Sequence, residues 1–208
     1  MQERVDTIER RPPGRRNAAL GLANLLTFAR LAAVPALAAV MFFVEGEAAN
    51  WAALAIFTAA AVTDFLDGWV ARAWGQQSAL GRMLDPIADK LIVGAALLLL
   101  VANQTIAGLS VWAALIILSR EILVSGLREF LAELNVRVAV TRLAKWKTAV
   151  QMAALCFLLA GGAGDNACGC ATDIGLALLW AAALVTLYTG FDYFRAGLKY
   201  ALEYEERR

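Results

Sequence analysis

The chain has 208 residues, of which 61% are apolar and 18% are charged, with a net charge of +1 and a mean hydropathy of +0.62. Ordinary globular chains are about 45–50% apolar and about 25% charged, so this excess indicates an integral membrane protein rather than a soluble domain. The near-zero charge argues against nucleic acid as a partner, and the absence of histidine excludes Ser-His-Asp hydrolysis and His-ligated zinc or haem, leaving acid–base or metal chemistry to Asp, Glu, Lys or Tyr.

Residues 1–17 are charged and contain Arg10-Arg11-Pro12-Pro13-Gly14, which predicts a cytoplasmic tail with a turn. Six apolar runs follow, each suited to a membrane-spanning helix. They cover residues 18–44, 50–71, 83–102, 107–131, 143–162 and 173–197. We therefore expect an all-α, polytopic protein of six transmembrane helices, with a six-helix membrane domain at 18–200 and a second cytoplasmic tail at 201–208. The glycine-containing stretch 161–172 is expected to be a connection on the outer side.

Basic side chains are distributed unevenly between the two sides of this predicted bundle. With an even number of spans both termini lie on one side, and fifteen of the 19 Lys and Arg residues belong to it: Arg4, Arg10, Arg11, Arg15, Arg16, Arg72, Arg82, Arg137, Arg142, Lys145, Lys147, Arg195, Lys199, Arg207 and Arg208. The other four lie within spans: Arg30, Lys90, Arg120 and Arg128. Because cytoplasmic loops carry an excess of Lys and Arg, we expect both termini in the cytoplasm and the protein in the inner (cytoplasmic) membrane.

Carboxylates follow one face of the second predicted span near its cytoplasmic end. Asp64, Asp67, Gly68 and Ala71 stand at i, i+3, i+4 and i+7, which places them on a single helix face. A charged side chain inside a bilayer costs on the order of 2–3 kcal/mol unless something neutralises it. The small residues leave room for a ligand to approach the backbone, and Arg72 follows at the mouth of the span.

A matching stripe opens the third span, where Gly81, Asp85 and Asp89 are spaced by four. A short cytoplasmic hairpin joins the two spans, so the two stripes can face each other. Four carboxylates without a cation would repel one another. A histidine-free cluster of oxygen ligands is typical of a site for one or two Mg²⁺ or Mn²⁺ ions.

Structural roles for these carboxylates stay open. Asp85 could be a helix N-cap with Pro86 at the first helical position. Asp64 with Arg72, or Asp89 with Lys90, could form structural ion pairs. Capping and pairing do not by themselves explain four carboxylates in register with three small residues and an arginine, so we favour the metal site.

Together the stripes read Asp64-x2-Asp67-Gly68-x2-Ala71-Arg72-x8-Gly81-x3-Asp85-x3-Asp89, eight positions at fixed spacing. This pattern resembles, without gaps, the signature of the CDP-alcohol phosphatidyltransferases. Segments 61–68, 84–90, 119–130 and 145–152 are further similar to bacterial members of that family that use glycerol 3-phosphate.

The resemblance implies that a hydroxyl of glycerol 3-phosphate attacks the lipid-linked phosphorus of CDP-diacylglycerol, and that CMP leaves. It also implies that Asp64, Asp67, Asp85 and Asp89 are the metal ligands and that Asp89 is the catalytic general base. The residues that it implies for CDP-diacylglycerol binding are Thr27, Gly68, Ala71, Arg72, Ser78 and Gly81. Members of the family form homodimers, so a homodimer is expected by the same resemblance.

The phosphate of the acceptor requires basic side chains of its own. Those predicted to bind it are Arg120, Arg128, Lys147 and Arg195, because arginine forks suit a phosphate dianion. A structural role stays open for them too. Basic residues are common near cytoplasmic span ends, and Glu121 could pair with Arg128.

Two other functions are compatible with such a cluster. Another acceptor, such as inositol phosphate, serine or a phosphatidylglycerol, would keep the family and change the product. A cation transporter would use the carboxylates as a transport site. Transport sites lie near the bilayer midplane, often at broken helices of inverted repeats, whereas these carboxylates lie at one edge and the sequence has no visible repeat. We therefore expect the transferase.

Overall fold

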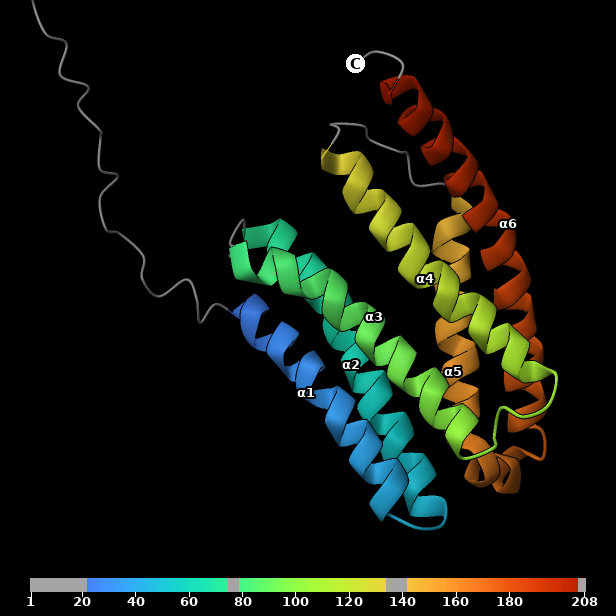
Figure 1. Cartoon of the computed structure of the whole chain (residues 1–208). Coiled ribbons are helices and arrows are strands. Elements are labelled where there is room, and N and C mark those ends of the chain that lie inside the picture. The colour runs from blue at the N-terminus through green and yellow to red at the C-terminus, as the bar shows by residue number, and fades with distance from the viewer. Residues whose placement is uncertain (1–21, 75–78, 134–141, 206–208) are drawn as a thin grey trace, which may run out of the picture.

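The computed structural model describes residues 22–74, 79–133 and 142–205. These residues form six helices, which confirms the expected all-α fold: α1 (Leu22–Phe43), α2 (Glu47–Trp74), α3 (Ala79–Ala102), α4 (Ser110–Glu133), α5 (Arg142–Cys168) and α6 (Ala171–Glu205) (Figure 1). Within the helices, the side chains at 22–24, 64–74, 79–82, 133, 142–145, 192–193 and 196–205 lie outside the description.

The helices form two groups that meet at a shared core. Helix α1 packs on both α2 and α3, while α6 packs on both α4 and α5, and contacts between α2 and α5 join the groups. The core contains Phe57, Leu97, Ile117, Leu155 and Leu179, all of them at most 1% exposed. Helices α3 and α4 contact each other only sparsely. In Figure 1 the two groups lie close together at the lower end and diverge toward the upper end.

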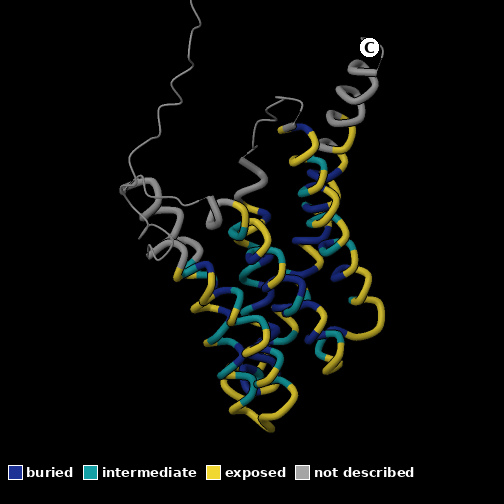
Figure 2. Tube along the Cα trace, turned by 60° about the vertical axis from the view of Figure 1, so that its left-hand side comes forward, coloured by how far each residue is buried: buried dark blue, intermediate teal, exposed yellow. Residues whose placement is uncertain are grey.

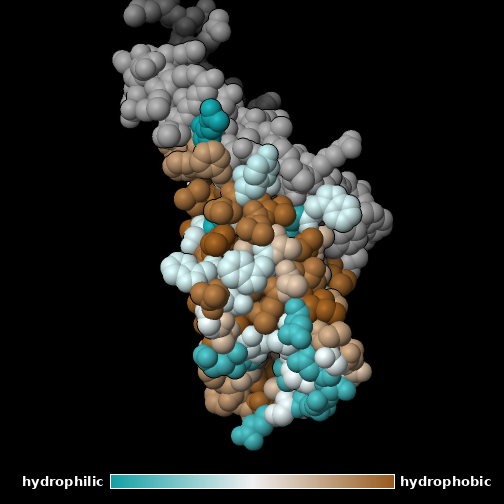
Figure 3. Space-filling view, turned by 90° about the vertical axis from the view of Figure 1, so that its right-hand side faces the viewer, coloured by the Kyte–Doolittle hydropathy of each residue, from teal (hydrophilic) through white to brown (hydrophobic). Residues whose placement is uncertain are grey.

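The outer surface of the bundle is apolar along much of its length. Large hydrophobic side chains are exposed on several helices, including Phe43 at 85%, Trp146 at 72% and Phe191 at 66%. Figure 2 shows buried residues on the inward faces of the helices and exposed ones on the outward faces. Figure 3 shows a broad hydrophobic surface above a hydrophilic lower end. Such a surface is suited to lipid rather than to water.

Four helices in the described part of the chain are long and apolar enough to cross a membrane. They cover Leu25–Phe43, Ser110–Ala132, Trp146–Cys168 and Ala171–Phe191. The segment Glu47–Thr63 is a shorter apolar helix, and α3 carries Asp85, Asp89 and Lys90 in its first half.

Helix α5 is bent at Gly161, whose φ of 46° and ψ of −134° are not helical. The positive φ favours glycine, and a Cβ at this position would lie 2.7 Å from Nδ2 of Asn50, so the Asn50 amide would have to shift. Asn50 donates a hydrogen bond from Nδ2 to the carbonyl of Leu159 at 3.2 Å, which satisfies an oxygen just before the bend. The expected outer connection at 161–172 is therefore mostly helical, because α5 continues beyond the bend to Cys168.

Hydrogen bonds between elements connect the end of the bundle at which α2 and α6 begin. Asp165 accepts two from Thr172, one from the backbone amide at 2.8 Å and one from the hydroxyl at 2.6 Å. Asn166 donates to Oε1 of Glu47 at 2.7 Å, which connects the end of α5 to the start of α2. With the bond from Asn50, this end is tied across α2, α5 and α6.

Candidate active site

Helix α3 carries the two predicted metal-binding carboxylates that the structure describes. Asp85 and Asp89 are half-buried and lie about one turn apart on the same helix face. Helix α3 begins at Ala79 and runs through Pro86, so the reading of Asp85 as a helix N-cap is wrong. Lys90 donates from Nζ to the carbonyl of Pro86 at 3.3 Å. The carboxylates thus project from the interior of a helix, not from its first turn.

Thr27 of α1 orients one of these carboxylates. Its hydroxyl donates to Oδ1 of Asp85 at 2.5 Å, and its side chain is only 1% exposed. The family resemblance implied that Thr27 binds CDP-diacylglycerol, whereas the hydroxyl of Thr27 contacts a predicted metal ligand. The hydrogen bond engages Oδ1, which leaves Oδ2 of Asp85 available, and carboxylate oxygens are the ligands that Mg²⁺ and Mn²⁺ prefer. The described carboxylates therefore fit a divalent cation.

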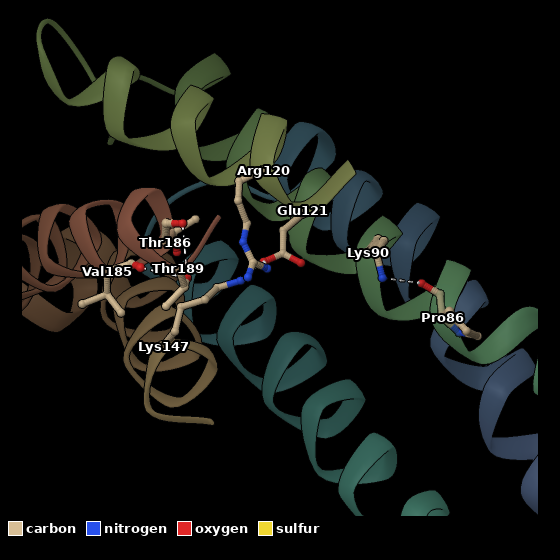
Figure 4. A network of polar contacts seen from close by, with 8 residues as sticks. All are labelled: Pro86, Lys90, Arg120, Glu121, Lys147, Val185, Thr186 and Thr189. Atoms are coloured by element: carbon tan, nitrogen blue, oxygen red, sulfur yellow. Dashed lines mark hydrogen bonds and ion pairs between the residues drawn. The ribbon is translucent and has the colours of Figure 1, made fainter. Parts of the chain in front are cut away.

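A second charged cluster joins α4, α5 and α6 (Figure 4). Glu121 on α4 forms an ion pair with Lys147 on α5, and its Oε1 lies 3.6 Å from Nη1 of Arg120. Lys147 is buried at 4% exposure. Gly190 on α6 makes room for the Arg120 stem, because a Cβ there would lie 3.0 Å from Cγ of Arg120. Two cations and one carboxylate are thus held together where three helices meet.

Asp89 on α3 lies near enough to Lys147 on α5 for a weak charge attraction, weaker than that between Glu121 and the same ammonium. This predicted base and this predicted ligand of the acceptor phosphate belong to different groups of helices.

A cavity of about 490 Å³ opens between α3 and α4. Most of its lining is apolar, and its polar lining residues are Lys90, Glu121, Ser125 and Glu129. Glu121 therefore contacts Lys147 on one side and lines this cavity as well.

Two buried polar groups belong to the helices around Lys147. Gln151 follows Lys147 by one turn on α5 and is 4% exposed, and Thr186 on α6 is fully buried. Within the described part of the chain, neither Oε1 of Gln151 nor the hydroxyl of Thr186 has a hydrogen-bond partner. Buried polar atoms are normally paired, with water or a ligand where protein does not suffice.

The remaining predicted ligands of the metal and of CDP-diacylglycerol cannot be placed. Asp64, Asp67, Gly68, Ala71, Arg72, Ser78 and Gly81 lie outside the residues whose side chains are described. Among the described side chains, no group of three or more Cys, Asp or Glu could hold a metal ion. Of the four predicted carboxylates, the described side chains include Asp85 and Asp89, whereas the two on α2 lie outside the description.

The predicted acceptor residues fall into two groups. Arg120 and Lys147 meet at Glu121. Arg128 and Arg195 are exposed, and no described contact connects either of them with Glu121. The proposed pairing of Glu121 with Arg128 is wrong, because the carboxylate of Glu121 turns toward α5.

Glu121 is the member of this cluster that the sequence prediction did not include. The signal was available in principle, because a carboxylate within an apolar span requires a cation nearby. Only the three-dimensional arrangement, in which α6 packs on both α4 and α5, shows that this cation is Lys147.

Comparison with known proteins assigns a family to this arrangement. The profile of the CDP-alcohol phosphatidyltransferases matches residues 20–188. A Cereibacter sphaeroides protein named CDP-diacylglycerol–glycerol-3-phosphate 3-phosphatidyltransferase is 41% identical over 85% of this chain and 95% of its own length. A Rickettsia bellii protein of the same name is 43% identical over 86% of this chain and 96% of its own. A rice protein named cardiolipin synthase (CMP-forming) is 41% identical over 85% of this chain and 57% of its own. The chain belongs to the CDP-alcohol phosphatidyltransferase family.

Proposed function

We propose that the protein transfers the phosphatidyl group of CDP-diacylglycerol to glycerol 3-phosphate, giving phosphatidylglycerophosphate and CMP in phospholipid biosynthesis. A bond forms between the acceptor hydroxyl oxygen and the lipid-linked phosphorus, and the bond from that phosphorus to CMP breaks. The observation that carries the proposal is the identity of 41–43% with bacterial relatives of that name, over nearly their whole length.

The roles proposed for individual residues follow the positions of the two clusters. Asp89 accepts the proton of the attacking hydroxyl. Arg120 and Lys147 hold the acceptor phosphate, with Arg128 and Arg195 contributing at the same end of the bundle. In such a site one small acceptor would have its phosphate at Arg120 and Lys147 and its reacting hydroxyl at Asp89.

Mg²⁺ or Mn²⁺ is the proposed cofactor, as one or two ions held by Asp64, Asp67, Asp85 and Asp89. Bound there, the metal would neutralise charge on the pyrophosphate. Gly68, Ala71, Arg72, Ser78 and Gly81 are proposed to contact CDP-diacylglycerol. Thr27 is proposed to contribute to its binding through Asp85, because its hydroxyl donates a hydrogen bond that orients this carboxylate.

We propose six membrane spans in the inner (cytoplasmic) membrane, formed by residues 18–200, with tails at 1–17 and 201–208. Both termini and the active site face the cytoplasm, since fifteen of the 19 Lys and Arg residues fall on that side of a six-span bundle. The head group of CDP-diacylglycerol is then reached at the membrane boundary while its acyl chains stay in the bilayer. The proposed assembly is a homodimer.

The competing acceptor is a phosphatidylglycerol, which carries a phosphodiester monoanion instead of a phosphate dianion; the rice relative is named cardiolipin synthase (CMP-forming). The pair of cations at Glu121 favours the dianion. The name of that relative belongs to a protein of which this chain covers only 57%.

The test incubates purified protein with CDP-diacylglycerol, Mg²⁺ or Mn²⁺, and labelled glycerol 3-phosphate, inositol phosphate, serine or phosphatidylglycerol in parallel. We expect CMP release and a labelled lipid only with glycerol 3-phosphate. CMP release with another acceptor, and none with glycerol 3-phosphate, would refute the proposed activity and leave the family standing.

A further inference from the structure

The carboxylate of Glu121 lies against Arg120 and Lys147, the two cations that are proposed to hold the acceptor phosphate. It contacts Nζ of Lys147 and lies 3.6 Å from Nη1 of Arg120. Lys147 is 4% exposed and the Glu121 side chain is 17% exposed. A buried ammonium without a counter-ion is strongly destabilised. Glu121 therefore supplies the anion that Lys147 requires while no acceptor is bound.

A phosphate arriving at Lys147 competes with this carboxylate. Both anions need the same N–H donors, three on the lysine and five on the arginine. If Glu121 kept its position, two like charges would lie against each other in a site poor in water, which is unfavourable. Phosphate binding is therefore coupled to displacement of the Glu121 carboxylate.

The structure offers Glu121 a second position. Its side chain lines the cavity of about 490 Å³ between α3 and α4, and Lys90 lines the same cavity from α3. The described contact of Lys90 is a 3.3 Å bond to a carbonyl of its own helix, a weak engagement for an ammonium. Figure 4 shows Glu121 lying between Lys147 on one side and Lys90 on the other.

We propose that Glu121 is a positioning residue with two states. It neutralises Lys147 and Arg120 in the empty site, and it turns toward Lys90 when the phosphate of the acceptor takes its place. This inference rests on the proposed function, because it concerns the same acceptor phosphate. It makes Glu121 and Lys90 determinants of acceptor affinity, although neither is proposed to touch the reacting atoms.

The first test is Glu121→Gln, which keeps the size of the side chain and removes its charge. We expect the KM for glycerol 3-phosphate to fall about tenfold at saturating CDP-diacylglycerol, because a competing charge-assisted bond is lost. The matched control is Glu129→Gln, an exposed carboxylate on α4 that lines the same cavity, and its KM should stay within about twofold of wild type. An unchanged KM with a lower melting temperature would mean a structural role only. A raised KM would mean that Glu121 binds the acceptor. Either result overturns the proposal.

The second test is Lys90→Met, which removes the alternative partner. We expect a several-fold higher KM for glycerol 3-phosphate in the wild-type background and no effect of the same change in Glu121→Gln, a coupling that a double-mutant cycle measures. Equal effects in both backgrounds would overturn the two-state proposal. If Glu121→Gln does not fold, the single Lys90→Met variant decides, and an unchanged KM overturns the proposal.

Failure of the proposed function is distinguishable from failure of this inference. Wild-type protein that releases no CMP with glycerol 3-phosphate refutes the acceptor assignment alone. The role of Glu121 is then tested without turnover, by measuring the melting temperature at increasing concentrations of inorganic phosphate. We expect the melting temperature of Glu121→Gln to rise at lower phosphate concentrations than that of wild type. Identical titrations overturn the inference.

Discussion

Replacing Thr27 by valine tests whether α1 controls the carboxylates of α3. Valine keeps the β-branched shape of threonine, so the change replaces one hydroxyl by a methyl group and alters little else. In the structure that hydroxyl donates to Oδ1 of Asp85 at 2.5 Å from a position that is 1% exposed. Water therefore has little access to replace the lost donor.

The magnitude follows from the charge of the acceptor oxygen. A hydrogen bond to a charged group contributes about 1.5–3 kcal/mol. If all of it serves to orient Asp85 in the transition state, kcat/KM falls about 10-fold to about 150-fold, since each 1.36 kcal/mol is a factor of ten. Because the residue acts through a proposed metal ligand, the concentration of Mg²⁺ or Mn²⁺ needed for half-maximal rate should also rise.

The assay measures CMP release against CDP-diacylglycerol, acceptor and metal concentrations, with the melting temperature recorded in the same detergent. Thr27→Ser is the matched control, because it retains the hydroxyl and should keep most of the activity. A valine variant within twofold of wild type would refute the reasoning. A rise in the KM for CDP-diacylglycerol with no change in metal dependence would instead favour direct binding of that substrate by Thr27.

Three further predictions concern the bend in α5, the base and the cofactor. Gly161→Ala should lower the free energy of unfolding by about 1–2 kcal/mol, because it forces an L-residue to positive φ and puts a Cβ 2.7 Å from the Asn50 amide. The control is Gly162→Ala, which should have the melting temperature of wild type because no atom lies within 4 Å of its new Cβ. Equal melting temperatures of the two variants would contradict this account. Asp89→Asn should abolish turnover while CDP-diacylglycerol binding, measured by equilibrium titration, stays nearly intact; normal turnover would remove Asp89 from the role of base. Chelation with EDTA should stop CMP release and added Mg²⁺ or Mn²⁺ should restore it, whereas full activity in EDTA would argue against a metal cofactor.

Much of the fold could be predicted from hydrophobic run length alone. Six apolar runs became six helices in the expected order, because a run of about 20 apolar residues is stable in a bilayer only as a helix. The error fell at 161–172, where Gly161, Gly162 and Gly164 indicated a loop. The helix continues there because Asn50 of α2 satisfies the carbonyl of Leu159 at the bend. A tertiary contact of this kind leaves no periodic trace in the sequence.

The candidate site was predictable to the extent that it depends on spacing along one helix. Asp85 and Asp89 share a face of α3 as their spacing of four requires. The partner of Glu121 could not be predicted in this way. The spacing of seven along α4 suggested Arg128, whereas the observed partner, Lys147, comes from another helix. Which residues of different helices come together depends on how the helices pack across the whole core.

The hydrogen bonds at the end of the bundle where α2 and α6 begin have a mechanical consequence. Asn50 donates to Leu159, Asn166 to Glu47 and Thr172 to Asp165, so a helix that tilts would hinge at this end. A helix of 20 residues is about 30 Å long, so tilting it by about 5° about one end displaces its other end by about 2.6 Å. The carboxylates of α3 belong to one group of helices, and the cations of α4 and α5 belong to the other. A small change of tilt between the two groups is therefore enough to change the distance between these carboxylates and cations by about the width of an atom.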